Sequence, residues 1–246
     1  MASILCLETS TEVCSVALSV GGRAVTVRED TSGKNHALLL ARFIEEVMKE
    51  TNLPFSGLDA IAVSGGPGSY TGLRIGVSTA KGLCYASSLP MIAISSLEAM
   101  AYHVINKPYI FGIEKKESVL YCPMIDARRM EVYASVYNHA MEKIRRIQAD
   151  VIDQGSFASF LEIHKILFFG NGADKCKTTL QHPNALFIDH ITTSACYLAE
   201  LAETAFNAGN FVDVAYYEPY YLKDFVATIP TKNIFHSNKD TNLLQG

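Results

Sequence analysis

The chain has 246 residues, 49% of them hydrophobic and 19% charged, which is the composition of a globular protein and excludes a disordered one. Its formal net charge of −4 at pH 7 argues against independent binding of nucleic acid, which needs a basic surface. No apolar run approaches the roughly 18 residues that span a membrane. No basic segment precedes the first strand pattern either, so the sequence predicts a cytoplasmic protein without a membrane contact.

The first half of the chain alternates between strand-like and helix-like patterns. Strands are predicted over residues 4–8, 13–20 and 24–27, and Gly21-Gly22 is a hairpin turn between the last two. A helix follows over 35–50, with the side chain of Asn35 in position to cap it. The pattern continues with a strand over 58–63, a glycine-rich loop over 64–72, a helix that ends before Pro90, and a strand over 91–94.

The second half repeats this order. Strands are predicted over 119–126, 131–137, 145–152 and 166–169, with a helix over 156–163 and a glycine loop over 170–172 that leads into a short helix. In each half an acid ends the first strand, Glu8 or Asp126, and a glycine loop ends the fourth. A repeat of this length predicts two similar subdomains that face each other across a cleft. The simpler alternative is that both acids only cap turns.

We expect an N-terminal subdomain over 1–108, a second one over 109–230 that includes a C-terminal docking segment, and a flexible tail over 231–246. Four tyrosines (216, 217, 220 and 221) surround Glu218-Pro219 near the C-terminus. Given the net acidity of the chain, they favour a segment pinned to the protein body over a platform for stacking bases.

Four stretches of the sequence resemble the TsaB family, also called YeaZ. They are residues 4–18, the glycine-rich stretch 64–76, the run 125–133 and the short motif 218–222. The resemblance implies an α/β fold of the actin-like ATPase (ASKHA) type, built from two duplicated RNase H-like subdomains. It also implies a non-catalytic scaffold that pairs with a TsaD-like protein for threonylcarbamoyl transfer to adenosine 37 of tRNA. A TsaE-like ATPase would bind the pair, tRNA would be met only through the complex, and the isolated chain would be a homodimer.

The chain lacks the side chains that a catalytic site of this kind needs, and we expect no metal, no cofactor and no catalytic residue. The resemblance implies that TsaD-type catalysis needs a metal held by two histidines four residues apart on this helix, but position 40, four residues after His36, is Leu40. His103 has no second ligand beside it. The six cysteines are scattered, without a Cys-x-x-Cys pair, which favours reduced and buried thiols.

The resemblance and the glycine-rich loop together predict a degenerate nucleotide-like cleft. Backbone N–H groups of such a loop can surround a phosphate, but no Lys-Ser or Lys-Thr follows the last glycine, so the loop is not a P-loop. Arg128 stands where a phosphate-binding loop favours glycine; its side chain either obstructs a phosphate or binds one. The cleft residues are Glu8, Thr9, Ser10, Gly65, Gly66, Gly68, Asp126 and Arg128.

Two helices are predicted to form a partner surface. The apolar arc of the first is wider than one sheet would cover, and the second has a smooth face of small residues. The predicted interface residues are Leu39, Leu40, Phe43, Val47, Gly72, Ile75, Gly76 and Ala80. A larger side chain at Gly76 should then block association and leave the monomer folded. The alternative is that these residues serve only internal packing.

A second functional class stays open beside the scaffold. Glu8, Asp126 and the two glycine loops are also compatible with an actin-fold kinase or ATPase that acts alone on a small molecule. Binding of Mg-ATP by the isolated chain would separate the two classes. A metalloprotease is a third and weaker alternative, since it would require bound zinc or iron.

Overall fold

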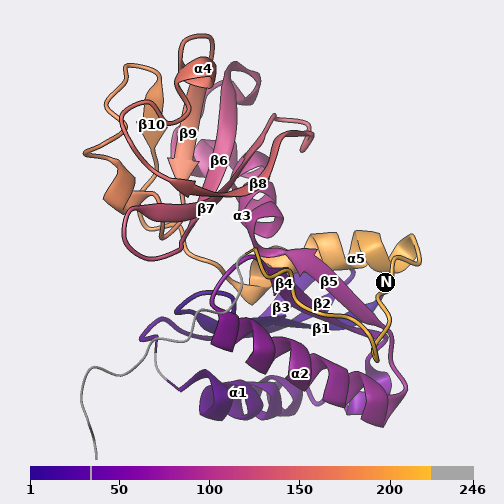
Figure 1. Ribbon diagram of the computed structural model, residues 1–246. Helices are drawn as coiled ribbons and strands as arrows, with labels where there is room; N and C mark the ends of the chain where they lie inside the picture. Colours follow the sequence, from indigo (N-terminus) through magenta and orange to yellow (C-terminus); the bar gives the residue numbers. More distant parts are fainter. Residues whose placement is uncertain (34, 223–246) are drawn as a thin grey trace, which may run out of the picture.

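The strands of the described chain form two five-stranded mixed sheets, one in each half. The protein is represented by a computed structural model that describes residues 1–33 and 35–222. The tail expected over 231–246 lies outside the described residues. Figure 1 shows the two sheets one above the other, with helices between them and on the outer face of the first.

The first sheet has the order β3-β2-β1-β4-β5. Its strands are β1 (Ser3–Glu8), β2 (Cys14–Val20), β3 (Arg23–Asp30), β4 (Ala60–Gly66) and β5 (Met91–Ser95). The central strand β1 is antiparallel to β2 and parallel to β4. Every residue of β4 is buried, as expected for a central strand covered by helices on both faces.

The second sheet repeats this arrangement, with the order β10-β9-β6-β7-β8. Its strands are β6 (Val119–Asp126), β7 (Glu131–Tyr137), β8 (Lys143–Val151), β9 (Lys165–Phe169) and β10 (Ala185–Phe187). The central strand β6 is antiparallel to β7 and parallel to β9, just as β1 is to its neighbours. The predicted duplication is therefore confirmed, and with it the α/β fold of the actin-like ATPase type.

The helices are distributed unevenly between the two sheets. They are α1 (His36–Glu50), α2 (Tyr70–Ser87), α3 (Ser96–Asn106), α4 (Ala158–Leu161) and α5 (Ala199–Asn207). Single 3₁₀ turns are η1 (Phe55–Gly57), η2 (Pro108–Phe111), η3 (Lys116–Ser118), η4 (Asp174–Cys176) and η5 (Ala195–Leu198). In Figure 1, α1 and α2 cover the outer face of the first sheet and α5 covers the opposite face.

Two helix predictions are wrong in detail. The Asn35 side chain does not cap α1, because Asn35 has a left-handed backbone (φ 65°) rather than the extended one of a capping residue. The helix predicted over 156–163 shrinks to the single turn α4, since Phe157 before it is also left-handed (φ 60°). The sequence patterns did not predict α3 or α5.

Each subdomain is completed by chain from the other half. Although α3 follows the first sheet in sequence, its Leu97 and Met100 pack in one cluster with Tyr121 and Phe169 of the second sheet. Conversely, Leu198 from the end of η5 lies in the apolar cluster on the first sheet. This exchange makes the junction between the halves part of the hydrophobic core, so the two do not pack as independent units.

The C-terminal segment 212–222 runs back along the first subdomain. The Val212 N–H donates to the Met91 carbonyl oxygen (2.9 Å), and the Tyr220 N–H donates to the Gly65 carbonyl oxygen (2.7 Å). Lys81 Nζ of α2 donates to carbonyl oxygens of the same segment at 3.0 and 2.9 Å. The tyrosine-rich stretch is thus held by backbone hydrogen bonds, as a docking segment would be.

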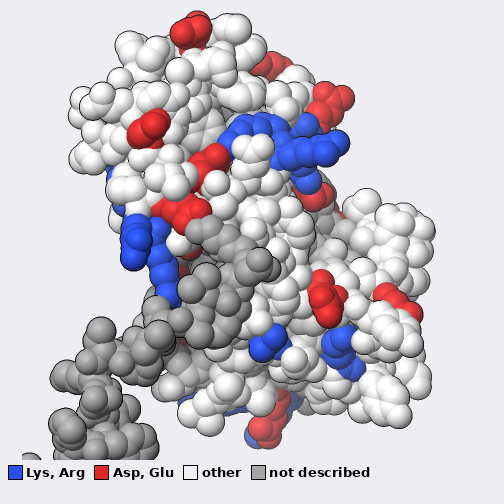
Figure 2. Space-filling model, viewed as in Figure 1, with Lys and Arg blue, Asp and Glu red and all other residues white. Residues whose placement is uncertain are grey.

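The described residues contain no helix long and apolar enough to cross a bilayer. On the face in Figure 2, acidic and basic side chains are interspersed among large uncharged areas. The six cysteines are free thiols, five of them buried.

The junction contains a histidine whose titration should make stability depend on pH. His103 stacks on Tyr197 with ring centroids 3.8 Å apart. Burial, assisted by the charge of Lys107, lowers the pKa of His103 from its ordinary 6.5 to about 4. As the pH falls through this window, the unfolded chain binds a proton that the folded chain excludes, so folding stability is lost.

We therefore expect His103→Phe to flatten the pH dependence of the unfolding free energy between pH 7 and pH 4. The wild type should lose about 2 kcal/mol more than the variant over this range, after allowance for the partial exposure of the ring. Urea unfolding at a series of pH values measures the difference. His164→Gln, at an exposed position, serves as the control for loss of a histidine. Equal slopes for wild type and His103→Phe would show that the ring does not resist protonation.

Candidate functional site

The two acids predicted from the repeat stand at equivalent places. Glu8 ends β1 and Asp126 ends β6, and these are the central strands of their sheets. The Asn171 side chain lies between the two loops that follow. Its Nδ2 donates to Glu12 Oε2 (2.7 Å), and its Oδ1 accepts from the Asp126 N–H (3.1 Å). The structure therefore brings both halves of the predicted cleft to one junction.

Glu8 is a buried structural anchor. Only 1% of the residue is exposed, and its Oε1 accepts from the Ser10 N–H (2.5 Å) and from Ser64 Oγ (2.9 Å). Burial raises the pKa of the Glu8 carboxyl, and the hydrogen bonds from Ser10 and Ser64 offset part of that shift. The carboxyl thus ties the end of β1 to β4.

The glycine-rich loop closes onto the β1–β2 loop. The Ser69 N–H donates to the Ser10 carbonyl oxygen (2.6 Å), and Thr9 Oγ1 donates to the Gly72 carbonyl oxygen (2.8 Å). A Cβ at Gly68 would overlap the Ser10 carbonyl, and one at Gly72 would overlap the Thr9 carbonyl. The glycines are needed because the backbones touch. The two loops therefore contact each other through their backbones, and the degenerate nucleotide-like cleft stays a prediction.

The outer side of the same loop is covered as well. A Cβ at Gly65 would meet the Tyr217 hydroxyl, and one at Gly66 would lie close to the Tyr220 carbonyl oxygen. The rings of Tyr70 and Tyr221 approach to 4.7 Å beside it. The docking segment therefore packs against the two glycines that were predicted to approach a nucleotide.

Asp126 in the second half is also engaged. It forms an ion pair with Lys175, whose Nζ further donates to the carbonyl oxygens of Arg129 (2.6 Å) and Glu131 (2.7 Å). Arg128 and Arg129, in the turn between β6 and β7, both have a left-handed backbone conformation (φ 72° and 48°). Their side chains are exposed. Lys175 thus occupies the space beside the Asp126 carboxylate and ties it to the turn that follows β6.

The two histidines weighed as metal ligands have other contacts. His36 Nε2 lies 3.0 Å from the Thr11 carbonyl oxygen, which ties the start of α1 to the β1–β2 loop. His103 is in the aromatic stack of the junction. Within residues 1–33 and 35–222, no group of three or more His, Cys, Asp or Glu side chains is placed to hold a metal ion.

The reasoning that led to the predicted partner surface needs correction. Six of its eight residues are buried in the core of this same chain, because α1 packs on β2 and beside α2: Leu40, Phe43, Val47, Gly72, Gly76 and Ala80. The smooth face at Gly76 packs on Thr9 and does not face outward. Leu39 and Ile75 are half-buried, so a contact with a partner stays a prediction for these two.

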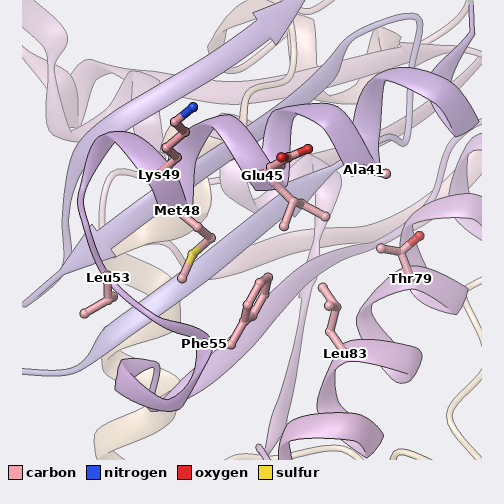
Figure 3. A pocket seen from close by; sticks show the side chains of 9 residues that line it. Ala41, Glu45, Met48, Lys49, Leu53, Phe55, Thr79 and Leu83 are labelled. Atoms are coloured by element: carbon pink, nitrogen blue, oxygen red, sulfur yellow. The ribbon is translucent and has the colours of Figure 1, made fainter.

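An apolar groove between α1 and α2 was missed. It has a volume of about 630 Å³, and Figure 3 shows its side chains converging from both helices and from the connection after α1. Ala41, Ile44, Glu45, Met48, Lys49, Leu53, Phe55, Thr79 and Leu83 line it. Phe55 keeps 36% of its surface exposed. The available signal was the pair of large apolar residues, Leu53 and Phe55, in a connection that otherwise reads as a polar turn.

Together these features define a class: an actin-like ATPase fold in which the glycine-rich loop is hydrogen-bonded to the β1–β2 loop and Asp126 is paired with a lysine. The sequence model of the family described as tRNA N6-adenosine threonylcarbamoyltransferase (TsaD) matches residues 27–231. A tRNA N6-adenosine threonylcarbamoyltransferase from Wolbachia pipientis subsp. Culex pipiens is 33% identical over 116 residues, which cover 41% of this chain and 34% of that protein.

Other relatives match almost the whole chain. A tRNA threonylcarbamoyladenosine biosynthesis protein TsaB from Haemophilus influenzae is 31% identical over 242 residues, covering 91% of this chain and 94% of that protein. The crystal structure of YeaZ from Pseudomonas aeruginosa superimposes with a TM-score of 0.74 at 28% identity and covers 90% of this chain and 100% of that one. The chain belongs to the TsaB (YeaZ) family, and this membership places it in the biosynthesis of threonylcarbamoyladenosine in tRNA.

The packing of Gly76 gives a matched pair of variants on one helix. Gly76→Ala should destabilise the isolated chain by about 1–3 kcal/mol, because the new Cβ overlaps Thr9 Oγ1. Gly82→Ala, where nothing lies within 4 Å, should stabilise it by up to about 1 kcal/mol through helix propensity. Denaturant unfolding measures both. If Gly76→Ala only impairs association and leaves stability intact, the original interface prediction for Gly76 is restored.

Proposed function

We propose that this chain is a non-catalytic scaffold subunit that pairs with a TsaD-like protein for threonylcarbamoyl transfer to adenosine 37 of tRNA. The observation that carries the proposal is the hydrogen bond from the Ser69 N–H to the Ser10 carbonyl oxygen. These loops would have to separate to admit a phosphate, and the pairing of Asp126 with Lys175 removes the second acid from metal binding. Family membership supplies the pathway, and this closed cleft supports the absence of turnover.

The groove between α1 and α2 supports pairing. An exposed apolar hollow of this kind is characteristic of a binding surface. Glu45 and Lys49 at its border provide the polar rim of an interface. Threonylcarbamoyltransferases resemble this chain in sequence, so such a partner would present a related helix pair. Two like surfaces can meet about an approximate two-fold axis. The same geometry allows a homodimer of the isolated chain, and Leu39 and Ile75 would extend the contact.

The other partners follow from the same proposal. A TsaE-like ATPase would bind the assembled pair, and tRNA would be bound by the complex and not by this chain alone. The net charge of −4 agrees with that division, because the chain has too little basic surface to hold a tRNA by itself. The alternative of an independent kinase would require the glycine-rich loop and the β1–β2 loop, which are hydrogen-bonded to each other, to separate and admit ATP.

Reconstitution tests the scaffold role. Purified TsaD-like and TsaE-like proteins and the adenylate-forming enzyme from the same organism are mixed with ATP, threonine, bicarbonate and unmodified tRNA. Modification of the tRNA should require this chain, and the isolated chain should not hydrolyse Mg-ATP. Full modification without the chain, or ATP turnover by the chain alone, would contradict the proposal.

A charge placed in the groove tests the pairing surface. Phe55→Glu should lower the affinity for the TsaD-like partner by about 2 kcal/mol or more, because a carboxylate would be buried among Met48 and Leu83. Stability should change little, since Phe55 is part-exposed in a connecting turn. Calorimetric titration of the partner measures the affinity. Ile163→Glu, at a site 75% exposed on the other subdomain, is the control. Equal partner affinity for Phe55→Glu and the control would exclude the groove.

A further inference from the structure

We propose that the β6–β7 hairpin, through Arg128 and Arg129, contacts phosphate groups of the tRNA backbone in the assembled complex. This inference rests on the proposed function and names a site for it. The two side chains are exposed, and neither forms an ion pair with another residue in the described part of the chain. Two adjacent guanidinium groups can each bind a phosphate through paired N–H donors.

The left-handed backbone conformation of this turn costs conformational free energy, and arginine is a residue that rarely adopts it. Arg128 and Arg129 are the only consecutive non-glycine residues with positive φ within the described ranges. Hairpin turns of this kind prefer Asn and Gly, because a side chain in the left-handed region is strained. Strain of this sort persists at ligand-binding positions when the surroundings impose it. The residue type at these two positions is therefore explained by the side chains and not by the turn.

Three groups impose the conformation. The Arg128 N–H donates to Asp126 Oδ1 (2.8 Å), and the Ala127 N–H donates to the Glu131 carbonyl oxygen (3.0 Å). Lys175 Nζ donates hydrogen bonds to the Arg129 and Glu131 carbonyl oxygens and also forms the ion pair with Asp126. Lys175 thereby pairs with the Asp126 carboxylate and holds the backbone of the turn, and within the described residues no ion pair engages the two arginines.

The surroundings favour an RNA backbone over a protein surface. Arginines that anchor protein interfaces are enclosed by packed apolar groups that exclude water. Here the flanking residues Asp126 and Met130 are themselves exposed, so residues 1–33 and 35–222 provide no such enclosure. Contacts to phosphates stay hydrated and need only charge and donors. On the face in Figure 2 the basic side chains gather in separate places and form no continuous strip, which fits a local contact added to a larger binding surface.

The test uses the double variant Arg128→Asn/Arg129→Gly in complex with the TsaD-like partner, and unmodified tRNA as the probe. We expect tRNA affinity to fall about tenfold near 0.15 M salt, and the slope of log K against log salt to shrink by about 1.5, as for two lost phosphate contacts. The melting temperature of the chain should rise by about 2 °C, because Asn and Gly suit the turn. Arg128→Lys/Arg129→Lys should keep most of the salt slope.

A charge-matched control separates this site from a general effect of net charge. Lys115→Asn/Lys116→Asn removes the same charge from another surface segment and should leave the slope unchanged. The inference is overturned if the arginine variant keeps wild-type tRNA affinity and slope. It is also overturned if only the affinity for a protein partner falls, which would make the hairpin a protein contact. Either result leaves the scaffold role intact, because that role fails only if the chain does not pair with the TsaD-like protein or is dispensable for modification.

Discussion

The rest of the structure depends on the contact between the β1–β2 loop and the glycine-rich loop. A carboxyl group with 1% exposure, Glu8, accepts hydrogen bonds from Ser10 and Ser64 and thereby joins the ends of two central strands. A buried carboxyl is tolerated only where such donors surround it. The glycines at 68 and 72 then allow the two backbones to touch. The two loops thereby become part of the packed core of the first subdomain.

The two subdomains are joined by apolar packing. Residues of α3 pack on the second sheet, and Leu198 packs on the first. The buried hydroxyls of Thr11 and Thr193, 2.7 Å apart, add a polar link. Because this junction belongs to the core, opening it would expose apolar surface. The apolar contacts and this hydrogen bond therefore both favour the arrangement of the two subdomains seen here.

Those surfaces differ in chemistry. The α1–α2 groove of the first subdomain is apolar, with charges at its border, while the hairpin of the second subdomain carries two exposed arginines that form no ion pair with the described residues. The first suits a stable contact with a folded protein, and the second suits a hydrated contact with phosphates. A division of this kind reconciles an acidic chain with a pathway that acts on tRNA.

The sequence by itself determined where nine of the ten described strands lie along the chain, because short apolar runs and the hairpin at Gly21-Gly22 are local signals. The internal repeat likewise indicated the duplication, and the motifs indicated the family. The predicted length of the helix at α4 was wrong, because a hydrophobic pattern does not reveal that a single residue such as Phe157 has a left-handed backbone. The sequence also could not show what the apolar faces of α1 and α2 pack against. An apolar arc does not reveal whether a sheet, a neighbouring helix or another chain covers it.

Only the tertiary structure decided the state of the cleft. Glu8, Gly68 and Asp126 are the residue types of an open phosphate site as much as of a closed one. The closed state follows from contacts between residues far apart in sequence, Ser10 with Ser69 and Asp126 with Lys175, and no local propensity encodes them. The groove arises in the same way, because Phe55 and Leu83 meet only when the sheet brings α1 and α2 side by side.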